Sequence, residues 1–325
     1  MVTVDHMMNK ERTAQSKLSL VIPVYQEGSH IRSSVAVIEE VLKKNRLVYE
    51  IVLVDDGSKD NTWSELKLLA AENDKVTVLR LSRNFGKESA LCAGLEYADG
   101  DMLLVMDADL QHPPALIPEM VKYWLEGYDV VEGVKNSRGK ENPIYKLCAK
   151  FFYYILYRSS DIHLGKASDF KLLDRKVVEA WKEMPERAIF FRGMSAWLGF
   201  DRKQISFNVA ERVNGKTKWS LIRLIRLAVN AITSYTSVPL HCITLLGILM
   251  FLVTIVMGLQ TLFMKFSGRA LDGFTTVILL QLFIGSSIMT SLGIIGIYLT
   301  KIYKEVKGRP RYLVSKCIKG GDRKC

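Results

Sequence analysis

The chain has 325 residues, enough for one α/β domain with a core of ordinary size and a smaller additional unit. It carries 45 Lys and Arg against 34 Asp and Glu, and this formal net charge of +11 suits nucleic acid, an anionic membrane or phosphorylated substrates. The five cysteines are scattered without a CxxC pair, which argues against a zinc site or a disulfide framework and favours reduced thiols.

The N-terminal half alternates between two kinds of pattern. Residues 1–17 form a polar tail without the apolar stretch of a cleavable signal peptide, so we expect the N-terminus to stay in the cytoplasm. Apolar runs rich in β-branched residues then predict four strands: Leu18 to Val24, Tyr49 to Val54, Val76 to Leu81 and Met102 to Met106. Apolar residues at helical spacing predict the helices between them: Ile31 to Lys44, Trp63 to Ala71 and Glu88 to Ala98. This order predicts a Rossmann-like α/β domain with a mostly parallel sheet.

The ends of these strands carry the polar residues that a ligand site needs. In sheets of this kind, ligands bind beyond the carboxyl ends of the strands. Asp55 and Asp56 follow the second strand, Lys87 follows the third, and Asp107 and Asp109 follow the fourth. No GxGxxG follows the first strand and no GxxxxGK[ST] occurs anywhere, so a dinucleotide dehydrogenase or a P-loop NTPase is unsupported.

The pattern Asp107-Ala108-Asp109 indicates a metal site. Two carboxylates that stand two residues apart at a strand end can face one hard cation, and Gln111 can add an oxygen ligand. Mg²⁺ or Mn²⁺ at this position would neutralise a diphosphate leaving group. An inert surface turn is the alternative for so short a pattern.

The C-terminal third has the pattern of a membrane anchor. Within residues 237–300, the runs Val238 to Phe263 and Phe274 to Thr300 contain no formal charge, and each is long enough to span a bilayer. Small residues such as Gly285, Gly293 and Gly296 are expected to let the two helices approach closely and are compatible with a homo-oligomer. Basic residues flank both spans, so both termini are expected in the cytoplasm, the second as a basic tail over residues 301–325.

Residues 219–236 lie between the predicted domain and the first span. Their apolar residues recur at helical spacing among arginines, which predicts an amphipathic helix at the membrane surface; a core helix of the soluble domain is the alternative. Because much of the excess basic charge flanks the spans, we expect a lipid bilayer as partner and no nucleic acid.

Several motifs occur in an order that resembles a known family. VIPVYQE (Val21 to Glu27), VLVDDGSKDNT (Val52 to Thr62), LSRNFGKESAL (Leu81 to Leu91) and MDADLQHPP (Met106 to Pro114) are similar to family 2 glycosyltransferases of the GT-A fold. SDFKLLDR (Ser168 to Arg175), FFRGMSAWLGF (Phe190 to Phe200) and ERVNGKTKWSL (Glu211 to Leu221), followed by two spans, resemble the dolichyl-phosphate mannose synthase and bactoprenol glucosyltransferase branch. The resemblance implies a cytoplasmic GT-A domain over residues 18–218, an interfacial helix and a two-helix transmembrane hairpin.

The resemblance also implies roles for individual residues. Nucleotide-sugar binding falls to residues at the four strand ends, namely Pro23, Tyr25, Glu27, Asp55, Asp56, Lys87, Asp107 and Ala108. Asp107, Asp109 and Gln111 would bind Mg²⁺ or Mn²⁺, and Arg138 and Arg192 would bind the acceptor phosphate. Asp169, Arg212 and Lys218 form the implied catalytic group, in which the two basic residues close over phosphates.

The implied reaction is an inverting transfer of a sugar at the cytoplasmic face of the plasma membrane. The expected donor is a UDP-linked glucose or N-acetylglucosamine, and the expected acceptor is a polyprenyl phosphate such as undecaprenyl phosphate. The family assigns Asp169 as a base, but a phosphate monoester is mostly dianionic at neutral pH, so we expect Asp169 to act by positioning. A mannose synthase that uses GDP-mannose and a non-catalytic scaffold that keeps the fold remain alternatives. A processive polysaccharide synthase is disfavoured because QxxRW is absent.

Overall fold

The chain divides into two compact units. The structure is a computed structural model that describes residues 11–135, 168–184, 191, 197–207, 238–267 and 273–321. The first unit contains Met1–Ala149, Ile162–Lys218 and Pro310–Cys325, and the second contains Lys150–Asp161 and Trp219–Arg309. Several sequence predictions lie outside the described residues: the interfacial helix at 219–236 and the site residues Arg138, Arg192, Arg212 and Lys218.

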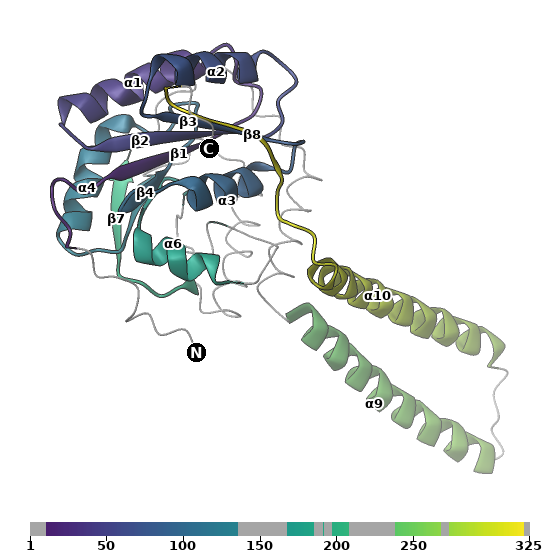
Figure 1. The fold of residues 1–325 in the computed structure, drawn as a ribbon. Coiled ribbons are helices and arrows are strands. Elements are labelled where there is room, and N and C mark those ends of the chain that lie inside the picture. The colour runs from purple at the N-terminus through teal and green to yellow at the C-terminus, as the bar shows by residue number, and fades with distance from the viewer. Residues whose placement is uncertain are drawn as a thin grey trace. The chain divides into compact units, whose positions relative to one another are not determined.

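The first unit is built on an eight-stranded mixed sheet in the order β7-β5-β6-β4-β1-β2-β3-β8 (Figure 1). Its strands are β1 (Leu18–Val24), β2 (Tyr49–Asp55), β3 (Val76–Leu81), β4 (Met102–Val105), β5 (Val130–Lys135), β6 (Lys171–Asp174), β7 (Arg202–Phe207) and β8 (Val314–Lys319). The four predicted strands form the parallel centre, because β1 pairs in parallel with both β2 and β4, and β2 pairs in parallel with β3. Antiparallel pairing joins β6 to β4 and to β5, and joins β8 to β3.

Helices cover both faces of this sheet. They are α1 (Ile31–Lys44), α2 (Thr62–Glu72), α3 (Lys87–Tyr97), the short η2 (Pro114–Leu116), α4 (Ile117–Leu125) and α6 (Arg175–Lys182). Successive strand residues point to opposite faces, so Leu20 and Ile22 pack with α1, α2 and α4, whereas Val21 packs with α3 and α6. Figure 1 shows these two helical layers on opposite sides of the sheet. The buried strands therefore hold their loops at one rigid edge.

The segment that follows the second apolar helix adds the outermost strand, β8. Its register places Ile318 beside Val78 and Lys316 beside Arg80 at the edge of β3. Arg311 donates a hydrogen bond to the carbonyl of Met184, and the Tyr312 hydroxyl donates to Glu96 on α3. The prediction of a plain basic tail over residues 301–325 was wrong, because β8 is an integral strand of the sheet.

Two other expectations change in detail. Residues 11–17 belong to the folded unit and not to a free tail, since Arg12 donates to the carbonyls of Trp124 and Tyr128 and pairs with Asp129. Cys317 in β8 is disulfide-bonded, so the expectation of reduced thiols was wrong for this residue.

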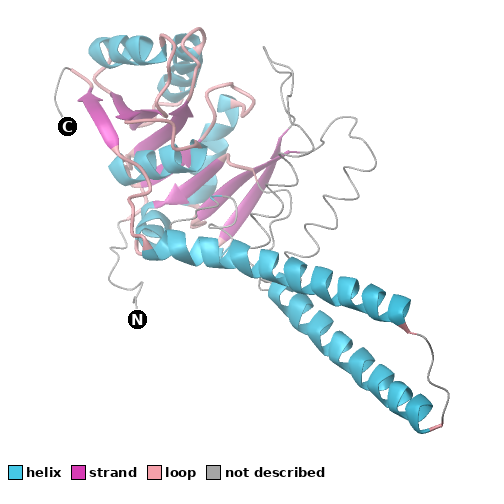
Figure 2. Ribbon diagram, turned by 90° about the vertical axis from the view of Figure 1, so that its right-hand side faces the viewer, coloured by secondary structure: helices cyan, strands magenta, loops and turns pink. Residues whose placement is uncertain are grey.

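The second unit consists, in its described part, of two long apolar helices, α9 (Val238–Phe266) and α10 (Phe274–Val306) (Figure 2). The stretches Pro239–Gln260 and Phe283–Val306 are long and apolar enough to cross a membrane, with mean hydropathies of 2.7 and 1.6, and neither is buried. Both helices run beyond the predicted ends at residues 263 and 300. A Cβ added at Gly285, Gly293 or Gly296 would meet no atom within 4 Å, so the expectation that these glycines bring the two helices together was wrong.

Candidate functional site

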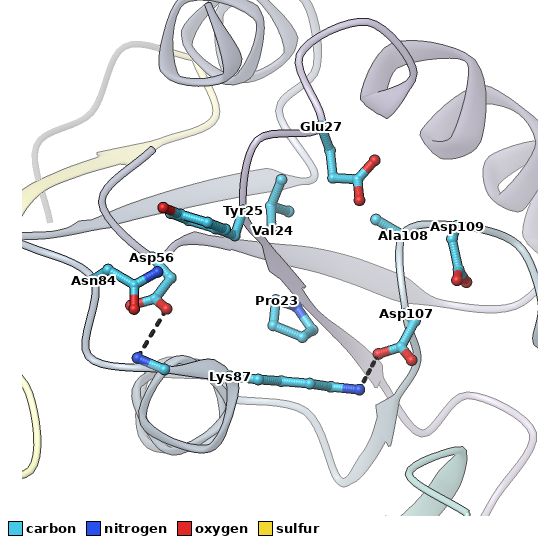
Figure 3. A pocket seen from close by; sticks show the side chains of 11 residues that line it. Pro23, Val24, Tyr25, Glu27, Asp56, Asn84, Lys87, Asp107, Ala108 and Asp109 are labelled. Carbon is cyan, nitrogen blue, oxygen red and sulfur yellow. Dashed lines mark hydrogen bonds and ion pairs between the residues drawn. The ribbon is translucent and has the colours of Figure 1, made fainter. Parts of the chain in front are cut away.

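A pocket of about 320 Å³ lies where the parallel strands of the first unit end (Figure 3). The loops after β1, β2, β3 and β4 contribute to it because parallel neighbours present their carboxyl ends at one edge. Its lining residues are Pro23, Val24, Tyr25, Glu27, Asp56, Asn84, Gly86, Lys87, Asp107, Ala108 and Asp109. The structure thus brings together every predicted nucleotide-sugar residue except Asp55.

Asp55 is fully buried and does not line the pocket. One of its carboxylate oxygens, Oδ1, accepts a hydrogen bond from the backbone N–H of Ser58 at 2.8 Å. The other, Oδ2, lies 3.2 Å from Nε of Arg80. That contact lacks hydrogen-bond geometry, and among the described residues Oδ2 is the buried side-chain atom without a hydrogen-bond partner.

Asp56 ties the end of β2 to the start of α3. Its carboxylate accepts hydrogen bonds from the backbone N–H groups of Phe85 at 2.7 Å and Gly86 at 2.9 Å. Burial raises the pKa of Asp56, and these two donors oppose that effect. A Cβ on Gly57, which has a φ of +68°, would lie 2.5 Å from the carbonyl carbon of Arg83, so only glycine permits this approach of two loops.

The loop after β1 supplies an aromatic ring and a carboxyl group. Tyr25 is 42% exposed at the pocket, and Gln26 adopts a left-handed conformation with a φ of 57°. The hydroxyl groups of Ser58 and Thr62 accept hydrogen bonds from the backbone N–H groups of Gln26 and Glu27 and so fix this turn. Burial raises the pKa of Glu27, and the negative charge of Asp109 raises it further.

The loop after β4 presents the predicted metal ligands. Asp107 and Asp109 both line the pocket, and the buried Ala108 lies between them. Oδ1 of Asp109 accepts the backbone N–H of Gln111 at 3.1 Å, and Leu110 has a left-handed φ of 56°. No group of three or more His, Cys, Asp or Glu side chains in the described part of the chain is arranged to hold a metal. Two carboxylates fit a cation that completes its coordination with substrate phosphates, as is usual for Mg²⁺.

Lys87 connects the metal-site loop to Asp169, and Figure 3 shows its contact with Asp107. Its Nζ lies 2.5 Å from Oδ1 of Asp107 and 2.9 Å from Oδ2 of Asp169, which is buried in the segment just before β6. Desolvation of the ammonium group lowers the pKa of Lys87, but the charges of Asp107 and Asp169 outweigh it and raise this pKa. An ion pair therefore joins the two predicted catalytic regions, which are far apart in sequence.

Two features beside the site were missed by sequence reasoning. Nδ1 of His112 accepts the backbone N–H of Asp107 at 3.3 Å, and its ring stacks on Phe170 at 5.0 Å. Lys171 and Glu132 form a fully buried ion pair, with Nζ 2.9 Å from Oε1. Burial alone would raise the pKa of Glu132, but the charge of Lys171 holds it below its usual value. The position of His112 directly after the metal motif could have indicated its contact with the site. No sequence pattern could have indicated the ion pair between Lys171 and Glu132.

Comparisons with known proteins identify the family of the chain. The sequence profile described as Glycosyl transferase family 2 matches residues 19–181. The chain is 40% identical over 302 residues to an uncharacterized glycosyltransferase of Synechocystis sp., over 92% of this chain and 95% of the relative. It is 34% identical to a prophage bactoprenol glucosyl transferase homolog of Escherichia coli, over 93% of this chain and 100% of the relative.

A solved structure shares the fold. Glucosyl-3-phosphoglycerate synthase from Mycobacterium tuberculosis, in complex with Mn²⁺, UDP and phosphoglyceric acid, aligns with a TM-score of 0.50 and 22% identity, over 68% of this chain and 77% of that one. The predicted GT-A fold is thereby confirmed. The chain belongs to glycosyl transferase family 2, is a glycosyltransferase, and falls in the branch that contains the bactoprenol glucosyl transferases.

Proposed function

We propose that this enzyme transfers a sugar from a nucleotide-sugar to a polyprenyl phosphate at the cytoplasmic surface of the membrane. UDP-linked glucose or N-acetylglucosamine is the proposed donor, and undecaprenyl phosphate is the proposed acceptor. The observation that carries the proposal is the pocket in which Asp107, Asp109 and Lys87 meet. The lipid acceptor is supported by relatives named bactoprenol glucosyl transferase, one of which matches over 94% of this chain.

The pocket offers suitable groups for a nucleoside. The exposed ring of Tyr25 can stack on a base, since aromatic faces accept any base, and Glu27 can bind ribose hydroxyl groups. Asp55, which the sequence assigned to the base, does not line the pocket; its Oδ2 lies 3.2 Å from Nε of Arg80 without a hydrogen bond, so Asp55 would reach a base N–H only if the pocket wall opened. Asp56 and Ala108 would shape the wall against which the donor lies.

The diphosphate would lie against the loop after β4. Asp107 and Asp109 would bind Mg²⁺ or Mn²⁺, with Gln111 as a further oxygen ligand. When bound, the cation would supply positive charge to the leaving diphosphate. Lys87 faces the same space and adds a fixed positive charge where negative charge develops, the type of preorganised electrostatics that lowers such barriers.

Transfer would occur in one displacement with inversion. A phosphate oxygen of the lipid attacks the anomeric carbon, a new carbon–oxygen bond forms, and the bond to the nucleotide diphosphate breaks. Because the lipid phosphate is already mostly dianionic at neutral pH, no base is needed to remove a proton. Asp169, held by Lys87 at 2.9 Å, would act by positioning the reacting groups.

The topology of the chain supports a cytoplasmic catalytic unit with both flanks of the hairpin on one side. α9 and α10 follow β7, and β8 follows α10, yet β7 and β8 belong to the same sheet. A chain that leaves the sheet and rejoins it must cross a membrane an even number of times. Two crossings, with basic residues at both flanks, fit a hairpin inserted from the cytoplasm.

The basic residues outside the described ranges complete the proposal. Arg212 and Lys218 would close over the leaving phosphates, and Arg138 and Arg192 would bind the acceptor phosphate. The amphipathic segment 219–236 would lie at headgroup height, where a polyprenyl phosphate presents its charge.

The test is a product assay with the purified full-length protein. We would incubate it in nanodiscs with Mn²⁺ or Mg²⁺, undecaprenyl phosphate and, in separate reactions, a panel of UDP- and GDP-sugars, and then weigh the lipid product by mass spectrometry. We expect a polyprenyl-phosphate hexose from a UDP-sugar. A product from GDP-mannose alone would replace the donor assignment, and donor binding without any lipid product would indicate a scaffold. NMR of the product should show inversion, and retention would contradict the single displacement.

A further inference from the structure

Lys87 lies against one of the two carboxylates that would bind the divalent cation. Its ammonium group lies 2.5 Å from Oδ1 of Asp107, and it lines the same pocket as Asp109. Figure 3 shows the Lys87 side chain extending from the start of α3 to Asp107. In this state the metal-site carboxylate is already neutralised by a cation of the protein itself.

An ammonium group and a divalent cation that bind the same carboxylate repel each other and compete for it. A divalent cation and an ammonium group held about 4 Å apart would repel even under water-like screening, by enough to weaken metal binding roughly thirtyfold. The repulsion falls if the ammonium group withdraws, and Lys87 has a second carboxylate that can retain it, Asp169, at 2.9 Å. The side chain is 41% exposed, so its four-carbon stem has room to shift.

We propose that Lys87 is a resident counter-ion that a divalent cation must displace from Asp107, and that the displaced ammonium group then serves the donor diphosphate. This proposal rests on the metal-dependent transfer proposed above and assigns Lys87 two opposite effects. Before the donor binds, Lys87 weakens metal binding. After the metal binds, Lys87 stays paired with Asp169 and attracts the negatively charged diphosphate into the pocket.

The contact between Lys87 and Asp169 determines the order in which the metal and the donor diphosphate bind. While Lys87 is shared between Asp107 and Asp169, the metal-site loop and the start of β6 are joined through one cation. Displacement by the metal releases the first of these contacts and keeps the second. The metal or its complex with the nucleotide therefore enters before Lys87 takes up its role beside the phosphates.

The experiment measures metal and nucleotide binding separately. Mn²⁺ binding to the full-length protein without nucleotide is followed by electron paramagnetic resonance, and UDP binding at saturating Mn²⁺ is followed by calorimetry. For Lys87→Gln we expect about tenfold tighter Mn²⁺ binding, from the lost repulsion, and about tenfold weaker UDP binding, from the lost attraction. Lys87→Arg keeps the charge, so it should not combine tighter Mn²⁺ binding with weaker UDP binding.

Three controls separate the possible failures. Lys122→Gln removes the same charge from a side chain that is 73% exposed on α4, and it should leave both affinities unchanged. Lys87→Met repeats the test with an apolar chain, and thermal unfolding verifies that each variant is folded. Unchanged or weaker Mn²⁺ binding in both Lys87→Gln and Lys87→Met would overturn the counter-ion role.

Asp107→Asn distinguishes this failure from a failure of the proposed function. If wild-type protein binds Mn²⁺, Asp107→Asn loses it and the Lys87 variants show no gain, only the role of Lys87 is refuted. If wild-type protein binds no Mn²⁺, or Asp107→Asn binds it equally well, the metal site itself is refuted and the counter-ion role falls with it.

Discussion

The two units of this chain are both rich in apolar residues, but the first buries them and the second exposes them. In the sheet unit, strands such as β2 bury every residue between two helical layers. In α9 and α10, side chains such as Leu245 and Phe251 are 68% and 66% exposed. The first unit therefore supplies its own low-dielectric interior, whereas the apolar side chains of the second are left uncovered by its described residues, as in helices that associate with a membrane.

The largest effect is expected in the interior of the sheet unit. Lys171→Met should destabilise it by about 3–5 kcal/mol, because Glu132 would remain charged, buried and without its lysine. The double variant Lys171→Met with Glu132→Leu should recover most of this loss, since no isolated charge remains. Thermal unfolding in detergent measures both. Equal stability of the single variant and wild type would show that water reaches this pair.

A large effect on activity is expected at the pocket edge without loss of folding. Asp107→Asn should lower the rate of lipid-product formation by roughly 10²–10³-fold, the usual cost of removing one preorganised electrostatic group. Its thermal unfolding should match wild type because Asp107 is partly exposed, with 29% of its side chain accessible. The matched control is Asp74→Asn, an exposed carboxyl group outside the pocket, which should retain the wild-type rate.

A charge placed on an apolar helix tests directly whether the exposed apolar residues of α9 and α10 face lipid. Phe251→Lys places a charge near the centre of α9, which should cost about 2.5–3.5 kcal/mol for insertion into a bilayer. In a water-exposed helix the same change would be harmless, since Phe251 is 66% exposed. Membrane fractionation and a glycosylation-based insertion assay measure the effect. Insertion of the Phe251→Lys variant as efficiently as wild type would contradict the membrane assignment.

The smallest effect is expected where the chain returns to the sheet unit after α10. Tyr312→Phe removes the hydroxyl that donates to Glu96 at 2.5 Å, and the loss should be about 1 kcal/mol. Thermal unfolding of the sheet unit provides the measurement. Leu313→Ala, at the neighbouring residue that is 54% exposed, is the control and should have a smaller effect.

Sequence patterns predicted those parts of the fold that local composition determines. The central strands are continuous apolar runs, and the structure reproduces them with shifts of about one residue at their ends, such as Val105 in place of Met106. β8 was not predicted, because VSKCIK contains two lysines and resembles a solvated tail. Only its pairing with β3 makes it a strand, and such pairing depends on a partner remote in sequence.

The pocket was predictable to the extent that it follows from strand order. Tyr25, Glu27, Asp107 and Asp109 were expected at one edge because parallel strands present their carboxyl ends together. The ion pairs of Lys87 were not predictable, because Asp169 is 82 residues away and reaches the site through an antiparallel strand. The partner of a charged residue can be identified only when the fold that brings the two residues together is known.

The position of β8 has a consequence for the way the protein is made. β3 is synthesised long before β8, so its outer edge lacks its partner strand until translation has passed through both apolar helices. An uncovered edge strand is a template for aggregation. Completion of the catalytic sheet is therefore timed after synthesis of the hairpin, so a nascent chain whose helices fail to insert would retain an incomplete sheet that quality-control proteases can recognise.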